Sequence, residues 1–204
     1  MTAQNTTGRG IVDLDAQAVE ATVSLVKRAR PADLGRPTPC AGWNLAGLIG
    51  HMTAQHYGWI AAAVGHGADL SVWQPGAPVA DPIGEYAEAS RRVLEAFGAD
   101  GVLDREFALA EISPVLRFPA PQAISFHFID YLVHGWDVAR SLGVDYQPEP
   151  DLLAAALPVA LAGPGGEARK RDGAAFAPVV AVPAQAGLLD QIVATLGRSP
   201  SWPR

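Results

Sequence analysis

Two histidines and two aspartates are concentrated in one apolar segment, residues 126–140. His127, Asp130, His134 and Asp137 follow one another at intervals of three or four residues, which on a helix places them along one side. An unpaired charge is too costly to bury, so such groups are neutralised, paired with an opposite charge or bound to a metal. The segment therefore predicts a helix whose buried side carries either ion pairs or a metal site.

Asp130 and His134 are the most favourable pair for a metal, because side chains four residues apart on a helix can bind the same ion. His51, in a separate apolar segment, can supply a third ligand. Two histidines and one carboxylate leave a coordination position open for water or substrate, which is typical of a catalytic site for zinc or another divalent transition ion. The spacing also allows His127 with Asp130 and His134 with Asp137, and it does not choose among these pairs.

The same residues have structural interpretations that need no metal. His51 can be a hydrogen-bonded core histidine, and Asp130 with His134 can be an ion pair. If a metal is bound, Gln55 and Asp137 are the candidates for hydrogen-bonding a ligand and orienting it. No catalytic or cofactor-binding residue is assigned, because the sequence contains neither a Gly-rich phosphate loop nor a nucleophile elbow.

Four further side chains carry individual predictions. His56 and His66 are expected to face solvent, and Trp43 is expected to lie in the core. Cys40 has no cation near it in the sequence that would favour a thiolate, so we assign it no role as a nucleophile.

The composition fits a compact soluble fold, with 49% apolar and 18% charged residues. A net charge of −6, with 15 scattered Lys and Arg residues, predicts neither nucleic acid nor a membrane surface as partner. Polar residues break the apolar run 41–64, which favours a core helix over a membrane span, and the polar segment 1–10 is typical of a frayed arm rather than a signal peptide. The single cysteine excludes an internal disulfide and fits a reducing cytoplasm.

Apolar periodicity near 3.6 residues, together with capping signals, predicts a mainly α fold. The expected helices cover residues 11–30, 45–64, 81–97, 121–142, 151–162 and 184–196. Residues 102–109 and 115–118 are expected to form short strands or an extended hairpin over the helix ends. An edge strand is expected at 176–183 and a polar loop at 163–171. We expect a four-helix bundle at about residues 11–145 and a C-terminal α/β extension at about residues 146–204, together forming a single domain.

Three motifs resemble those of a known family. Residues 38–51, TPCAGWNLAGLIGH, are similar to the TPCxxWxxxxLxxH opening of actinobacterial proteins related to mycothiol-dependent maleylpyruvate isomerase, within the DinB-like superfamily. Residues 134–140, HGWDVAR, resemble the HxWDLAR segment of that family, and residues 196–202, LGRSPSW, resemble the LGRxPxW tail of one branch. The resemblance covers nearly the whole chain.

The resemblance implies a DinB-like four-helix bundle with a divalent metal, usually Zn²⁺, in its core. It implies a histidine ligand on the second helix and a carboxylate-x-x-x-His pair on the last bundle helix, at the positions of His51, Asp130 and His134. The isomerase has Glu at the position of Asp130, and the shorter side chain leaves room for His127 or a water as ligand. The resemblance also implies that the metal activates a low-molecular-weight thiol, mycothiol, for attack on an electrophile.

Two functions from different classes follow. The first is a mycothiol-dependent transferase or isomerase in which the metal activates the thiol. The alternative is a non-catalytic metal- or ligand-binding bundle that has lost turnover, which Asp130 in place of Glu favours. The expected partners are a small-molecule thiol and an electrophilic substrate, and a homodimer is compatible with the sequence. The substrate, the metal and its occupancy, and the oligomeric state stay open.

Overall fold

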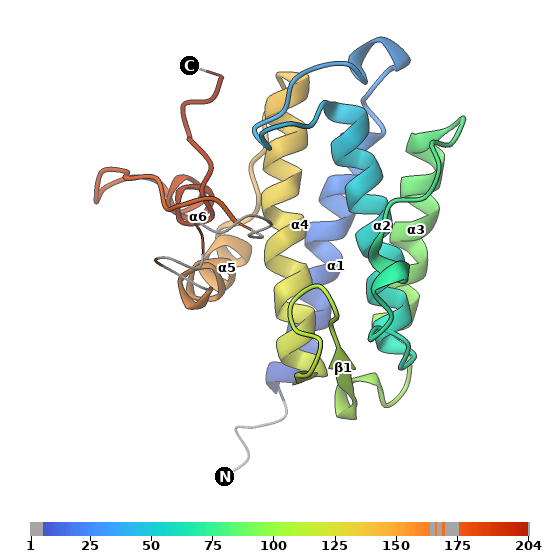
Figure 1. The fold of residues 1–204 in the computed structure, drawn as a ribbon. Helices are drawn as coiled ribbons and strands as arrows, with labels where there is room; N and C mark the ends of the chain where they lie inside the picture. The colour runs from blue at the N-terminus through green and yellow to red at the C-terminus, as the bar shows by residue number, and fades with distance from the viewer. Residues whose placement is uncertain (1–5, 164–165, 167–168, 170–175, 204) are drawn as a thin grey trace.

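Four long helices lie side by side and form the body of the structure (Figure 1). The structure is a computed structural model that describes residues 6–163, 166, 169 and 176–203. The long helices are α1 (Thr6–Val26), α2 (Leu45–Ala63), α3 (Pro82–Phe97) and α4 (Ala120–Leu142). The shorter helices α5 (Pro150–Ala162) and α6 (Leu188–Thr195) follow, and 3₁₀ turns lie at η1 (Pro31–Asp33), η2 (Leu70–Trp73) and η3 (Val102–Asp104). The predicted class, a mainly α bundle with a C-terminal extension, is confirmed.

Local sequence signals explain where the helices begin and end. The Asn44 side chain caps α2 by accepting a hydrogen bond from the Gly47 amide, and Asp81 caps α3 in the same way, ahead of Pro82 in the first helical turn. At the end of α4, Gly143 adopts a left-handed conformation with φ of 69°, which a residue without a Cβ adopts at little cost. The caps therefore fix the ends of the helices that carry the chemically interesting residues.

The helix α1 begins earlier than predicted. Residues 6–10 are helical and are not part of a frayed arm, because Ile11 near the start of the helix packs against the hydrophobic core. Residues 1–5, and most of the predicted loop 163–171, lie outside the described residues.

A two-stranded antiparallel sheet precedes α4. Strands β1 (Glu106–Ala108) and β2 (Arg117–Pro119) place Phe107 opposite Phe118, in the region where short strands are predicted. The predicted edge strand at 176–183 is wrong within the described part of the chain: this segment pairs with no strand, and Val180 N donates to the Ala194 carbonyl of α6 instead (2.9 Å). Its prolines remove the amide donors that a ladder needs.

The bundle packs as two pairs of helices, α1 against α4 and α2 against α3. The extension is joined to the bundle through apolar side chains, since Leu152 and Ala156 of α5 and Ile192 of α6 share one hydrophobic cluster with Leu132 and Trp136 of α4. In the part of the chain that the structure describes, none of the helices has the length and apolar character needed to cross a membrane.

Candidate metal centre

Three of the predicted side chains meet between α2 and α4. His51, Asp130 and His134 each offer a ligand atom, and these atoms all lie within 4.8 Å of one another. His134 Nε2 is 3.4 Å from Asp130 Oδ1, and the imidazole centroids of His51 and His134 are 5.5 Å apart. His134 is buried, whereas His51 and Asp130 are half-buried. The cluster is therefore open to solvent on one side, where a small molecule can approach.

Asp137 lies on the opposite side of the His134 ring from Asp130. Its Oδ2 is 2.9 Å from His134 Nδ1, so this nitrogen carries a hydrogen and donates it to the carboxylate. The tautomer fixed in this way presents Nε2 to Asp130. Such a carboxylate–histidine pair is the usual support of a metal-ligating histidine. Asp137 is thus placed to orient a ligand, as the sequence predicts for one of the alternatives.

Arg198 compensates the charge of the buried Asp137. Its Nη2 donates to Asp137 Oδ2 at 3.0 Å and lies 3.5 Å from Cys40 Sγ, and the Cys40 thiol itself donates to Asp137 Oδ2 at 3.2 Å. Burial alone would raise the pKa of Asp137, but Arg198 and His134 hold it at about 2. Cys40, His134 and Asp137 also lie close enough to hold a cation. Because the guanidinium of Arg198 already contacts Asp137 and Cys40, we assign no metal to this second group.

The two histidines of the centre differ in charge. Burial, reinforced by the nearby His134, lowers the pKa of His51 to about 4, so His51 is neutral and has a free lone pair near pH 7. Burial opposes a charge on His134 as well, but the nearby Asp130, together with Asp137, which accepts the hydrogen bond from His134 Nδ1, and Cys40, raises the pKa of His134 to about 10. The proton between His134 and Asp130 is the one that a metal would displace, because ligands must be deprotonated to bind. The donor set therefore fits a divalent metal.

The loop before α2 brings Cys40 and Trp43 to the centre. Thr38 Oγ1 accepts a hydrogen bond from Cys40 N (3.2 Å), and Arg36 Nη1 donates to the Leu142 carbonyl at the end of α4 (2.9 Å). Trp43 on this loop is 40% exposed, with its ring centroid 4.5 Å from that of His51. The prediction that Trp43 lies in the core is wrong, because the loop holds the indole outside the helices. It forms a wall of the open side of the centre.

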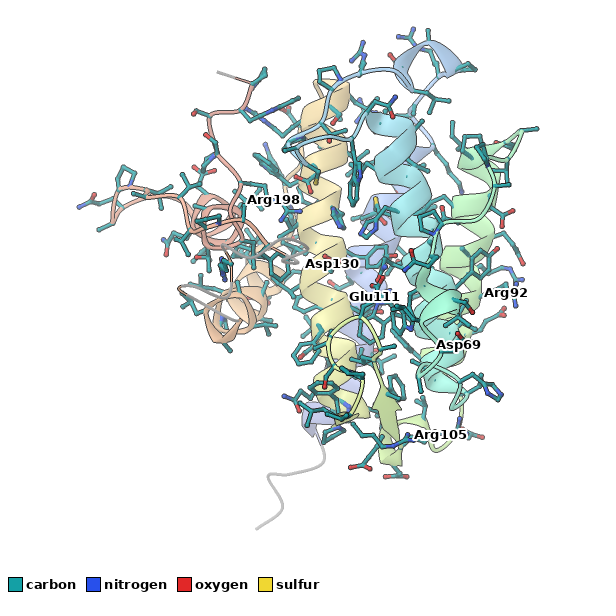
Figure 2. All side chains as sticks on the ribbon, in the orientation of Figure 1. Asp69, Arg92, Arg105, Glu111, Asp130 and Arg198 are labelled. Atoms are coloured by element: carbon teal, nitrogen blue, oxygen red, sulfur yellow. The ribbon has the colours of Figure 1, made fainter. Side chains whose placement is uncertain are left out.

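Gln55 contacts a carboxylate, Glu111, that the sequence analysis does not single out. Its Nε2 donates to Glu111 Oε2 at 2.7 Å, which ties α2 to the loop between β1 and β2. Burial and the charge of Asp130 raise the pKa of Glu111. In Figure 2, Glu111 and Asp130 lie near each other beside α4, whereas Arg198 lies toward the C-terminal segment. Gln55 thus positions Glu111 at the edge of the centre.

His127 is engaged away from this cluster. Its Nδ1 is 2.6 Å from Asp15 Oδ1 of α1, and its Nε2 is 3.2 Å from His56 Nδ1 of α2. With both ring nitrogens in hydrogen bonds, His127 has no lone pair directed at Asp130. His66 is exposed, as predicted, but His56 is fully buried and its predicted exposure is wrong. The turn of α2 carries His56 to the side that faces α3 and α4.

Comparisons with known proteins show the family to which the chain belongs. Residues 16–139 match the family model described as mycothiol maleylpyruvate isomerase N-terminal domain. The chain belongs to this family. The match to the isomerase N-terminal domain contains His51, Asp130 and His134, whereas Arg198 lies beyond its end. The resemblance drawn from the sequence motifs is therefore confirmed at the level of the family.

Two curated relatives are similar over most of the chain. They are "Uncharacterized protein MT0763" of Mycobacterium tuberculosis strain CDC 1551 / Oshkosh and "Uncharacterized protein Rv0738" of strain ATCC 25618 / H37Rv. Each is 31% identical over 188 residues, which cover 90% of this chain and 94% of the relative. No solved structure matches the chain significantly. The comparisons thus give this chain a mycothiol-related family and relatives of similar length, and they name no substrate.

Proposed function

We propose that the chain binds one divalent transition metal, in the first place Zn²⁺, through His51, Asp130 and His134, and that it is a mycothiol-dependent transferase or isomerase. The observation that carries the proposal is the convergence of two imidazoles and one carboxylate from α2 and α4, with one side open. A set of two histidines and one carboxylate leaves room for an exogenous ligand. Family membership supports a thiol as that ligand.

The residues around the centre have separate roles in this proposal. A bound metal would lower the pKa of a coordinated thiol and so favour the nucleophilic thiolate. Asp137 holds the His134 tautomer, and Arg198 neutralises Asp137 so that the carboxylate can stay buried. Glu111, held by Gln55, is the proton acceptor we assign at the edge of the centre. A reducing cytoplasm, where low-molecular-weight thiols stay reduced, is the compartment that this chemistry requires.

Metal analysis of the purified protein is the direct test. After loading with Zn²⁺ and dialysis, we expect one metal ion per chain in the wild type and in His66→Ala, which changes an exposed histidine outside the cluster. His51→Ala and His134→Ala are expected to lose the ion, because each removes one of the three ligands. A wild type that retains no metal, or a His134→Ala variant that retains it fully, would contradict the proposal.

A second candidate is a binding protein of the same family that performs no turnover. The shorter carboxylate of Asp130, compared with the Glu of the isomerase, favours this candidate, because it alters the reach of the ligand. Adding mycothiol and an electrophile such as maleylpyruvate, with a chelator-treated sample as control, separates the two. Metal-dependent consumption of the electrophile supports the enzyme. Metal-dependent thermal stabilisation by mycothiol without consumption supports the binding protein.

A further inference from the structure

A second polar cluster, separate from the metal centre, takes one residue from each bundle helix. His127 of α4 is hydrogen-bonded to Asp15 of α1 (2.6 Å) and to His56 of α2 (3.2 Å), and His56 Nε2 is 3.0 Å from Ser90 Oγ of α3. All four side chains are at most 1% exposed. We refer to Asp15, His127, His56 and Ser90 as the buried relay. Such groups remain in a dry core only when their hydrogen bonds are satisfied.

The direction of the hydrogen bonds in the buried relay follows from Ser90. Its hydroxyl has one hydrogen, which it donates to the Tyr86 carbonyl (2.8 Å), so Ser90 Oγ accepts from His56 Nε2. Burial and the proximity of His127 keep the pKa of His56 well below its usual value, so the ring is neutral and its Nδ1 accepts from His127 Nε2. One further proton then lies between His127 Nδ1 and Asp15 Oδ1.

This direction makes the buried relay electrically neutral. The opposite direction, with Ser90 donating to His56, would leave the Asp15 carboxylate as an uncompensated charge in the core. The titratable groups that face the relay from the neighbouring helices are Tyr86 and Tyr131, and the described residues in contact with it include no cation. Burial raises the pKa of Asp15, and its Oδ2 has no hydrogen-bond partner among the described side chains, as suits a group that shares a proton.

The buried relay and the metal centre span the same helix interface. The pairs His51–His134 and His56–His127 both connect α2 to α4, although α2 packs mainly on α3 and α4 mainly on α1. Tyr131 connects the two levels: its ring stacks on His56 with centroids 4.1 Å apart, and its hydroxyl donates to the carbonyl of Met52, the residue after His51. The buried relay and the metal centre are therefore linked through Tyr131.

We propose that Asp15, His127, His56 and Ser90 form a neutral, proton-carrying relay that positions α2 against α4 and so sets the affinity of the metal centre. All four are positioning residues, and only their effect on metal binding rests on the proposed function. With Asp15 the relay holds one proton more in the folded state than it would with an amide at that position. In Asp15→Asn the new side-chain amide can donate its own N–H to His127 without titrating.

The first test measures this proton without any metal. For apo protein we compare the unfolding equilibrium constants of the wild type and Asp15→Asn by urea titration between pH 5 and pH 7. On unfolding, the wild type releases one proton more than Asp15→Asn does. The ratio of the unfolding constant of the wild type to that of the variant should therefore increase about tenfold for each unit by which the pH is raised. Imidazole ¹⁵N NMR of the wild type should show His56 protonated at Nε2. A pH-independent ratio, or His56 protonated at Nδ1, would overturn the relay.

The second test measures Zn²⁺ affinity by competition with a chromophoric chelator. Ser90→Ala leaves the His56 N–H unpaired and should weaken Zn²⁺ binding by about 2- to 30-fold. The control is Thr53→Ala. Among the residues that the structure describes, the buried Thr53 hydroxyl bonds to the Ile49 carbonyl of its own helix alone, so this variant should leave Zn²⁺ affinity unchanged. Equal affinity in wild type and Ser90→Ala would overturn the positioning role. A wild type that binds no Zn²⁺ would overturn the proposed function, while the proton ratio in apo protein would still decide the relay.

Discussion

Replacing Asp137 with Asn is the most informative single change at the metal centre. Asp137 Oδ2 accepts hydrogen bonds from His134 (2.9 Å), from Arg198 (3.0 Å) and from Cys40 (3.2 Å). Asn keeps the size of the side chain but removes its charge, and its amide can donate to His134 Nδ1 and so favour the wrong tautomer. The variant therefore tests whether Asp137 orients a metal ligand or serves only as a partner for Arg198.

Two effects of different size are expected from Asp137→Asn. Loss of the carboxylate that orients a ligating histidine typically weakens metal binding about 10- to 100-fold, or about 1.4–2.7 kcal/mol. The free energy of unfolding of the apo protein should fall by about 3–5 kcal/mol, because Arg198 is left as an unpaired charge. The Arg198 side chain is only 10% exposed, so solvent does little to reduce this penalty.

A double variant separates the two effects. Asp137→Asn with Arg198→Met removes both charges, so it should be more stable than Asp137→Asn alone, yet it should bind Zn²⁺ as weakly. Zn²⁺ affinity is measured by chelator competition and stability by urea unfolding, with the exposed Asp100→Asn as the charge-matched control. If Asp137→Asn binds Zn²⁺ with wild-type affinity, the orienting role of Asp137 is refuted. If the double variant regains that affinity, the loss came from the buried charge instead.

The remaining predictions concern helix packing and pH. A Cβ on Gly58 would lie 2.3 Å from the Trp73 ring, so Gly58→Ala should lower the free energy of unfolding by about 1–3 kcal/mol. A Cβ on Gly50 of the same helix would meet no neighbouring atom within 4 Å, so Gly50→Ala should raise the free energy of unfolding by about 0.4–1 kcal/mol. If urea unfolding shows that both variants change the free energy of unfolding in the same direction, the packing around Gly58 is contradicted. Because the pKa of His134 is about 10 and that of His51 about 4, one proton must leave His134 when a metal binds between these values. Apparent Zn²⁺ affinity should therefore rise about tenfold per pH unit from pH 5 to pH 9, and a flat titration would show that His134 is not a ligand.

The sequence by itself predicted the helices and half of the candidate centre, because these depend on near neighbours in the chain. The capping residues Asn44 and Asp81 mark helix starts that the structure reproduces. The spacing of Asp130 and His134 brings the two side chains together in any helix, whatever surrounds it. Family membership, suggested by the motifs, follows from the same local patterns.

The tertiary structure alone decided which partners these residues have. Arg198 lies in the LGR motif of the tail, to which the sequence assigns no role, and its contact with Asp137 joins residues 61 positions apart. Periodicity placed His56 on a helix surface, but that surface faces α3 and α4, so His56 is buried against His127. Local spacing determines which side chains share a helix face. Only the packing of the helices determines what that face meets, and therefore which charges are paired and which nitrogens remain free to bind a metal.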